Sequence, residues 1–581
     1  MLRLSCELER SVLMIEKFKK LSRIKQILLV TVIVATFIRV LLAVKLPLFL
    51  QADSGFDDFL MMEYAKSLVK FKWLGEFNHM TLAKGVSFPI FIVLTYYLSI
   101  PYSFALILLY LVGVILLLYS LRPYIKSMWF YFVSYLFLIY SPVMFHIENV
   151  QKVYRGGLIV CMSLIVFASM ILIFNNFKDK KLSKLIKYSI LGSIALPFFY
   201  YIKEDSIWIM PFVLSALGFS FIQLIIDKKI DKKIIRSIFI VLPVVSLFIV
   251  NICYCSINYF VYGEYTITDR SGTYFKEVMA DIIRIDEPNE VEDIWITKSM
   301  LYKAIDNSKT LQTVKPYIDD MYVNSWAVRD NGEIGEDIIY WTLKDALGKA
   351  GVYSNGGKEV NEFYKKIDQE LDKAVETGKL KLSKKKKLYI SSITIGYTTK
   401  ELIDYYSKQT GPALDMMITY KENDTSINYA TGPMYAIIAM DHFTNSETVW
   451  PKDLSPVTEP YEVTISIITS IVSFYQSTGY IFFYVGLLGL VLFTYMMIKD
   501  IRKKKYEQLY LWLITLGFIG TSCVLLFGVL WFCSSYGGSL LRHFYNYTCG
   551  IVPIIQLLEL IGLYYVVIFI KKYILKKKRV D

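Results

Sequence analysis

Long apolar stretches recur along this 581-residue chain and constrain its fold more than any other feature. A helix of about 18 residues or more can cross the roughly 30 Å hydrocarbon layer of a bilayer. Because lipid cannot hydrogen-bond an open sheet edge, such stretches are expected to be helices rather than strands. The sequence therefore predicts an α-helical integral membrane protein with a bundle of about 10–12 helices. The expected spans are residues 26–47, 103–121, 128–146, 157–176, 187–202, 206–226, 235–258, 480–498, 508–532 and 546–570.

Lysine and arginine predict the orientation of these helices. Basic residues crowd every second connection, as in residues 178–187, 228–236 and 499–505, and the connections between them carry few. Because cytoplasmic loops are enriched in Lys and Arg, both termini are expected in the cytoplasm. The net charge of +13 follows from these short basic loops, so nucleic acid is not an expected partner.

Residues 263–462 contain no expected span and predict a domain on the outer face. The chain then divides into a transmembrane module at 1–262, an extracytoplasmic domain at 263–462 and a second transmembrane module at 463–581. Two apolar runs, Val86–Ile100 and Val463–Gln476, do not fit the alternation of sides. We expect them to be interfacial helices, the first within an interfacial or re-entrant region at 51–102.

Asp57 and Asp58 stand in the first outer connection, near the start of an expected helix at Gly55–Lys70. On a helical projection they fall within or beside the apolar arc that contains Met61. One interpretation is that they are first-turn residues favoured by the helix dipole. The other is that they face a buried polar cavity and carry chemistry.

Other ionisable residues collect at the outer ends of the spans. Arg39 lies inside the first span, where an unpaired Arg costs about 2.5–3.5 kcal/mol, so it is expected to pair with an acid, face a cavity or extend to the headgroups. Glu148, Lys152 and Arg155 are spaced i, i+4 and i+7 and are expected to share one helix face, as site residues or as an interfacial ion pair. Lys203-Glu204-Asp205 and Arg542-His543 are the remaining candidates. The alternative interpretation of the first is an ordinary polar turn, and that of the second is an interface anchor.

These features resemble the GT-C-fold membrane glycosyltransferases, which include the protein O-mannosyltransferases and the lipid A aminoarabinose transferases. Asp57-Asp58, followed by Tyr64-Ala65, is similar to the acidic motif of the first outer loop in that class. Over most of its length the chain also resembles uncharacterised bacterial membrane proteins of similar size. Further segments that resemble the class are Leu82–Pro89, Tyr154-Arg155, Lys203–Trp208 and Arg542-His543 with Pro553.

The resemblance implies a GT-C-like bundle with interfacial helices in the first outer loop and a mainly α extracytoplasmic domain. It implies transfer of a sugar from a polyprenyl-phosphate donor to a glycan, lipid or protein acceptor at the outer face of a bacterial plasma membrane, in cell-envelope biosynthesis. Asp57 is the first choice for the general base and Asp58 the second, since a carboxylate can accept the acceptor's proton. The substrate-binding candidates are Lys84, Arg155, Arg542 and His543 for the phosphate, with Glu148, Glu204 and Arg39 beside them.

Alternatives remain open at this point. A glycolipid or polysaccharide transport protein would use the same polar cavity without making a bond, and a catalytically inactive relative would only bind. No metal site is predicted from ligand spacing, although the acids with a histidine would form an alternative, divalent-metal version of the site. No phosphate-cradling loop or serine-hydrolase motif occurs in the sequence.

Overall fold

A computed structural model describes residues 22–288, 291, 293–454, 459–506, 508–535 and 541–575. Within these ranges the secondary structure is helical apart from isolated β-bridges. Nine helical segments of the described part are long and apolar enough to cross a membrane, so the chain is a multi-pass membrane protein. They are α2 (Arg23–Val44), α5 (Tyr102–Ser120), α8 (Arg155–Asn176), α9 (Leu182–Tyr200), η2 with α10 (Ser206–Ile226), α11 (Lys233–Tyr262), Tyr461–Arg502 within α20 (Glu459–Arg502), α21 (Leu509–Ser534), and Phe544–Leu575, which contains α23 (Val552–Phe569).

The span expected at 128–146 is shorter than predicted. Its helix, α6 (Met128–Ile139), has 12 residues and ends before Pro142, because a proline disfavours helical geometry in the residue before it. A short 3-10 turn, η1 (Pro142–Met144), follows. At 1.5 Å per residue α6 is about 18 Å long, less than the hydrocarbon layer. It nonetheless packs in the bundle against α2, α5 and α23.

The interfacial helix expected at 463–476 is not a separate element. α20 is one continuous helix of 44 residues, and this stretch forms part of its N-terminal half. The prediction was wrong because no proline lies between residues 461 and 502, so nothing in the backbone ends the helix there. At 1.5 Å per residue α20 is about 66 Å long.

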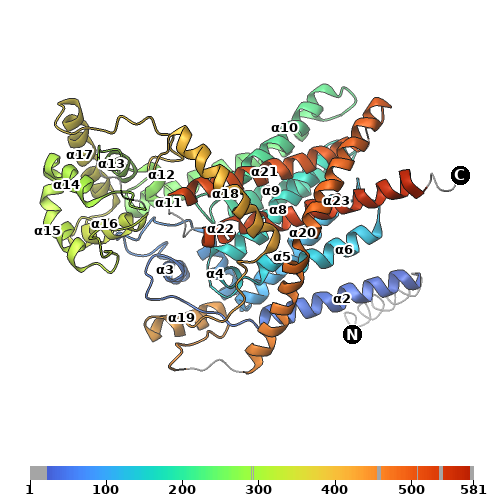
Figure 1. Ribbon diagram of the computed structural model, residues 1–581, viewed down its shortest axis with the longest axis horizontal. Coiled ribbons are helices and arrows are strands. Elements are labelled where there is room, and N and C mark those ends of the chain that lie inside the picture. Colours follow the sequence, from blue (N-terminus) through green and yellow to red (C-terminus); the bar gives the residue numbers. More distant parts are fainter. Residues whose placement is uncertain are drawn as a thin grey trace.

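Two short helices occupy the first connection, as the sequence predicts for residues 51–102. α3 (Asp58–Val69) packs against α4 (Ser87–Tyr97), a mostly apolar helix whose 11 residues are too few to span a bilayer. Figure 1 shows both at the end of the bundle next to the domain formed by α12–α17. The start of α2 and the end of α23 lie at the opposite end of the bundle.

The helices α12–α17 form a domain around a hydrophobic core of their own, which runs from Phe275 to Leu380. By contrast, α18 (Thr399–Thr419) packs on α20 and α21, α19 (Met434–Thr444) packs on α4, and both join the core of the bundle. The members of the domain are α12 (Asp269–Gly272), α13 (Tyr274–Ile283), α14 (Lys298–Asn307), α15 (Lys309–Asn324), α16 (Ile338–Lys349) and α17 (Gly357–Glu376).

The backbones of α20 and α23 touch at glycines. A Cβ added to Gly489 would lie 1.9 Å from the Gly562 carbonyl oxygen, and a Cβ added to Gly562 would lie 1.9 Å from the Gly486 carbonyl oxygen. Small residues let membrane helices approach this closely, and van der Waals packing then holds them together.

We expect Gly562→Ala to destabilise the protein by about 1–3 kcal/mol, because the added methyl group forces the two helices apart. Thermal unfolding in detergent measures the change. Gly520→Ala on α21 is the matched control, since a Cβ there meets nothing within 4 Å. Equal melting temperatures for the two variants would contradict the close α20–α23 contact.

Candidate functional site

An extended segment after α2 brings the first loop against residues far along the chain. Isolated parallel bridges join Leu48 to Thr448, Phe49 to Lys152 and Gln51 to Thr431. Asp58 fastens the end of this segment. Its Oδ2 accepts a hydrogen bond from the Gln51 N–H at 2.9 Å, its Oδ1 accepts one from the Phe59 N–H at 3.2 Å, and its side chain is fully buried.

Asp57 immediately precedes α3 and faces two polar partners. Its Oδ1 lies 3.3 Å from the Lys84 Nζ and accepts a hydrogen bond from the Tyr154 hydroxyl at 3.0 Å. The Asp57 side chain keeps 34% of its surface exposed, whereas that of Lys84 keeps 12%. Of the two neighbouring acids, Asp57 is therefore accessible and Asp58 is buried.

An ion pair between a buried arginine and a partly exposed glutamate lies beside Asp57. Arg155 is the first residue of α8, and its Nη1 donates to both carboxylate oxygens of Glu204, at 3.0 and 2.8 Å. Its Nη2 donates to the Tyr154 hydroxyl at 2.6 Å. The Gly85 N–H donates to the same carboxylate at 3.2 Å. Tyr154 and Glu204 thus connect Asp57, Lys84 and Arg155 into one hydrogen-bonded group.

The helix face expected to carry Glu148, Lys152 and Arg155 does not form. α7 (Ile147–Val150) ends, the chain runs irregularly through 151–154, and α8 begins at Arg155. Asn149 packs so closely on α8 that a Cβ on Gly156 would lie 2.2 Å from its Oδ1. As a result Glu148 pairs with Lys152 at 3.5 Å, and Arg155 turns to Glu204 instead.

Arg39 has carbonyl partners and no acidic partner in the described part of the chain. Its Nε donates to the Ile139 carbonyl at 2.7 Å and its Nη2 to the Met144 carbonyl at 2.8 Å. Its guanidinium lies 4.1 Å from the centre of the Phe145 ring. Ile139 is the last residue of α6 and Met144 the last of η1, so Arg39 binds backbone carbonyls where the helical structure is interrupted inside the bundle.

The last two predicted site residues lie outside the described side chains. Arg542 and His543 belong to α22 (Leu541–Thr548), but only the backbone of these two residues is described. Nearby, Lys203 pairs with Asp205 at 3.2 Å and lies 4.2 Å from the centre of the Tyr547 ring.

The α12–α17 domain contributes residues that the sequence did not single out. The Trp341 indole on α16 lies 5.2 Å from the Lys84 Nζ and 4.8 Å from the Arg270 guanidinium, and it stacks on Phe56 with ring centres 5.3 Å apart. Lys344 of the same helix forms an ion pair with Asp269. No motif marks these residues in the sequence, because only the folded domain brings them to the first loop.

Burial and neighbouring charges shift the pKa values of the ionisable groups around Asp57 in opposite directions. Burial alone would raise the pKa of Asp57, but the ammonium groups of Lys84 and Lys152 outweigh it and lower the pKa to about 2. Burial likewise opposes the effect of Arg155 on Glu204, whose pKa falls to about 2. Burial raises the pKa of Asp58 to about 6. Burial and the nearby Arg155 lower the pKa of Lys84 to about 8.

The acids do not fit a metal centre in this arrangement. Asp57 contacts Lys84 and Tyr154, and both oxygens of Asp58 accept backbone N–H groups. His79 lies 3.8 Å from Asp345, and the His146 ring accepts the Glu148 N–H. Among the described residues, no group of three or more His, Cys, Asp or Glu side chains is placed to hold a metal ion.

Comparison with known proteins finds one structural likeness to report. No protein-family model matches the chain, and no curated protein sequence does. Among solved structures, the chain is similar to ArnT from Cupriavidus metallidurans bound to undecaprenyl phosphate, with 10% sequence identity and a TM-score of 0.27. The alignment covers 91% of this chain and 77% of that one. At this TM-score the likeness adds nothing to the functional argument, which rests on the side chains described above.

We expect Glu204→Gln to destabilise the protein by about 2–4 kcal/mol, because it leaves the buried Arg155 charge without its counter-ion. The partial exposure of Glu204 places the expected loss at the lower end of the range for buried pairs. Thermal unfolding in detergent at neutral pH measures it. Asp205→Asn is the control, because its ion pair with Lys203 is more exposed. A Glu204→Gln protein as stable as wild type would contradict a structural role for the pair.

The raised pKa of Asp58 makes the stability of the folded protein depend on pH. Its folded pKa of about 6 lies above its value of 3.8 in an unfolded chain, so the folded state binds the proton more tightly. The stabilisation by this group is therefore complete below about pH 4 and is lost as the pH rises through about 6. We expect Asp58→Asn to reduce the fall in melting temperature between pH 5 and pH 7, and an unchanged fall would contradict this assignment.

Proposed function

We propose that this protein is a membrane glycosyltransferase that transfers a sugar from a polyprenyl-phosphate donor to an acceptor hydroxyl at the outer face of the membrane. The observation that carries the proposal is the accessible carboxylate of Asp57 in contact with Lys84 and Tyr154, beside the ion pair of buried Arg155 with Glu204. A base and fixed positive charge within one site are what transfer from a lipid phosphate requires. The GT-C resemblance of the first loop implies the same chemistry.

Lys84 is the residue we assign to the donor phosphate. Among the described side chains it is the cation that forms an ion pair with Asp57, and this contact, at 3.3 Å, is longer than the contacts between Arg155 and Glu204. An incoming phosphate competes with Asp57 for the ammonium group and adds negative charge beside the acid. Both effects raise the pKa of Asp57 from about 2, so donor binding makes Asp57 a stronger base.

Arg155 supplies positive charge that does not move. Glu204 holds its guanidinium through two hydrogen bonds, and the Tyr154 hydroxyl accepts a third. Tyr154 in turn donates to Asp57 and fixes the direction of that carboxylate. Charges held in place before the reaction stabilise a transition state without reorganisation.

The transfer step replaces one oxygen with another at the anomeric carbon of the sugar. The acceptor hydroxyl gives its proton to Asp57 while its oxygen forms a bond to the anomeric carbon of the sugar. The bond from that carbon to the phosphate oxygen breaks, and the electron pair leaves with the lipid phosphate. Lys84 and Arg155 stabilise the charge that grows on the phosphate, while the prenyl tail lies among the helices in the bilayer.

We expect Asp57→Asn to lower the rate of sugar transfer by about 10²–10⁴-fold, the usual contribution of a general base. The assay follows transfer from a polyprenyl-phosphate sugar by the purified protein. Donor binding should survive in Asp57→Asn and weaken in Lys84→Met, since only the second variant removes the proposed phosphate contact.

Asp53→Asn is the control for this experiment. Asp53 lies in the same loop, but its carboxylate accepts a hydrogen bond from Thr431, away from Lys84. Full activity of Asp57→Asn would remove the proposed base and favour a transport protein or an inactive relative. Loss of activity in all three variants alike would point to general damage of the loop.

A further inference from the structure

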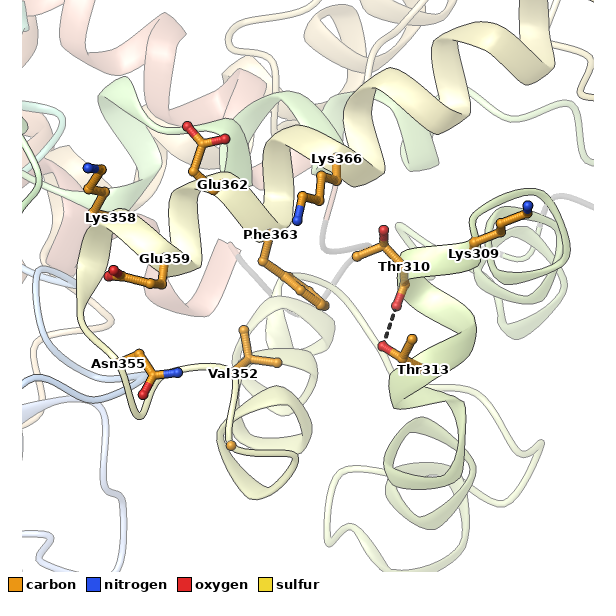
Figure 2. A pocket seen from close by; sticks show the side chains of 11 residues that line it. Lys309, Thr310, Thr313, Val352, Asn355, Lys358, Glu359, Glu362, Phe363 and Lys366 are labelled. Carbon is orange, nitrogen blue, oxygen red and sulfur yellow. Dashed lines mark hydrogen bonds between the residues drawn. The ribbon is translucent and has the colours of Figure 1, made fainter.

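The α12–α17 domain contains a hollow, lined by charged, polar and apolar residues, that the proposed chemistry does not use. It has a volume of about 630 Å³ and lies between the first turns of α15, the first turns of α17 and the turn after α16. Figure 2 shows Phe363 and Val352 between the two helices, with polar side chains around them. Both apolar residues are half-buried, whereas Lys309, Lys358 and Lys366 are exposed.

The walls of the hollow are fixed before any ligand arrives. The Glu370 carboxylate on α17 accepts hydrogen bonds from the Ser308 hydroxyl at 2.6 Å, the Thr310 N–H at 3.0 Å and the Thr310 hydroxyl at 3.2 Å. These bonds hold the start of α15 to the side of α17. A cavity with rigid walls loses little entropy when it binds a ligand.

The charge around the hollow is positive in excess. In the described part of the chain, Lys309, Lys358 and Lys366 form no ion pair and no side-chain hydrogen bond. Two acids line the hollow. Glu362 forms an ion pair with Lys365 at 3.5 Å, so Glu359 is the acid that remains to offset the three lysines. Lysine ammonium groups without a partner are suited to a carboxylate or phosphate group on a ligand.

The lining combines these donors with an aromatic surface. The ring of Phe363 and the methyl groups of Val352 offer an apolar patch to the C–H face of a sugar ring. The Asn355 amide both donates and accepts hydrogen bonds, as sugar hydroxyls require. The hydroxyls of Thr310 and Thr313 donate to Glu370 and to the Thr310 carbonyl, so they offer acceptor lone pairs to a sugar. A volume of about 630 Å³ falls in the range of ordinary ligand sites.

We infer that this hollow binds an acidic glycan, and, if the proposed function holds, that this glycan is part of the acceptor. α16 connects the two sites, because it carries Trp341 against Lys84 and leads into the turn that contains Val352. The distance along it, from residue 341 to residue 351, is about 15 Å at 1.5 Å per residue. Bridging a distance of this size takes a glycan of a few sugars.

The test measures binding of two probes to the full-length protein in detergent, with no donor present. The acidic probe is trigalacturonate and the neutral probe is maltotriose. We expect trigalacturonate to bind more tightly, and the double variant Lys309→Glu/Lys366→Glu to bind it at least about tenfold more weakly, as expected for loss of charge-assisted hydrogen bonds. Lys373→Glu/Lys379→Glu is the matched control, since both lysines are exposed at the C-terminal end of α17 or just after it, and neither lines the hollow.

The inference is overturned if the wild-type protein does not bind trigalacturonate. It is also overturned if the double variant binds trigalacturonate with the same affinity as the wild type. Because the probes bind without a sugar donor, the outcome is independent of transfer. Asp57→Asn should bind trigalacturonate as the wild type does. If that variant keeps full transfer activity while the lysine variant loses glycan binding, the proposed base fails and the glycan site stands.

Discussion

The ion pair between Arg155 and Glu204 is the contact on which the rest of the site depends. It joins the first residue of α8 to the turn after α9, and through the Gly85 N–H it also positions the loop that carries Lys84. Two charges in a mostly buried place stabilise each other only when further hydrogen bonds satisfy them, and Tyr154 and Gly85 supply these bonds. The direction of Asp57 follows from the same network, because Tyr154 donates to it.

Backbone that leaves the helical form within a bundle must find other partners. The chain from Tyr140 to Tyr154 is such a segment, with only the short elements η1 and α7 in it. Arg39 from α2 donates to the carbonyls of Ile139 and Met144 at its start. The same irregular segment ends at the site, with Lys152 and Tyr154 next to Asp57. Irregular backbone at this depth is tolerated where protein surrounds it.

The sequence predicted the membrane-spanning helices well, because their apolar stretches are long and the criterion is physical length. It placed α3 and α4 correctly in the first loop, and it named Asp57, Lys84, Arg155 and Glu204 as separate candidates. It did not predict that Arg155 lies on a different helix from Glu148, since α7 ends at Val150 and α8 begins only at Arg155. The sequence prediction divided α20 into an interfacial helix at 463–476 and a span at 480–498. The alternation of basic loops suggested this boundary, but the backbone is helical throughout.

Trp341 shows why the remaining site residues could not be found in the sequence. It lies more than 250 positions from Lys84, and nothing local distinguishes it from a core residue. In the fold it touches Lys84, Phe56 and Arg270 together. The domain is therefore part of the candidate site and not an interchangeable module on top of the bundle. A chimera that carried another protein's residues in place of 263–380 would lose the indole behind Lys84, and any evolutionary exchange of this domain would have to bring its own aromatic ring to the same place.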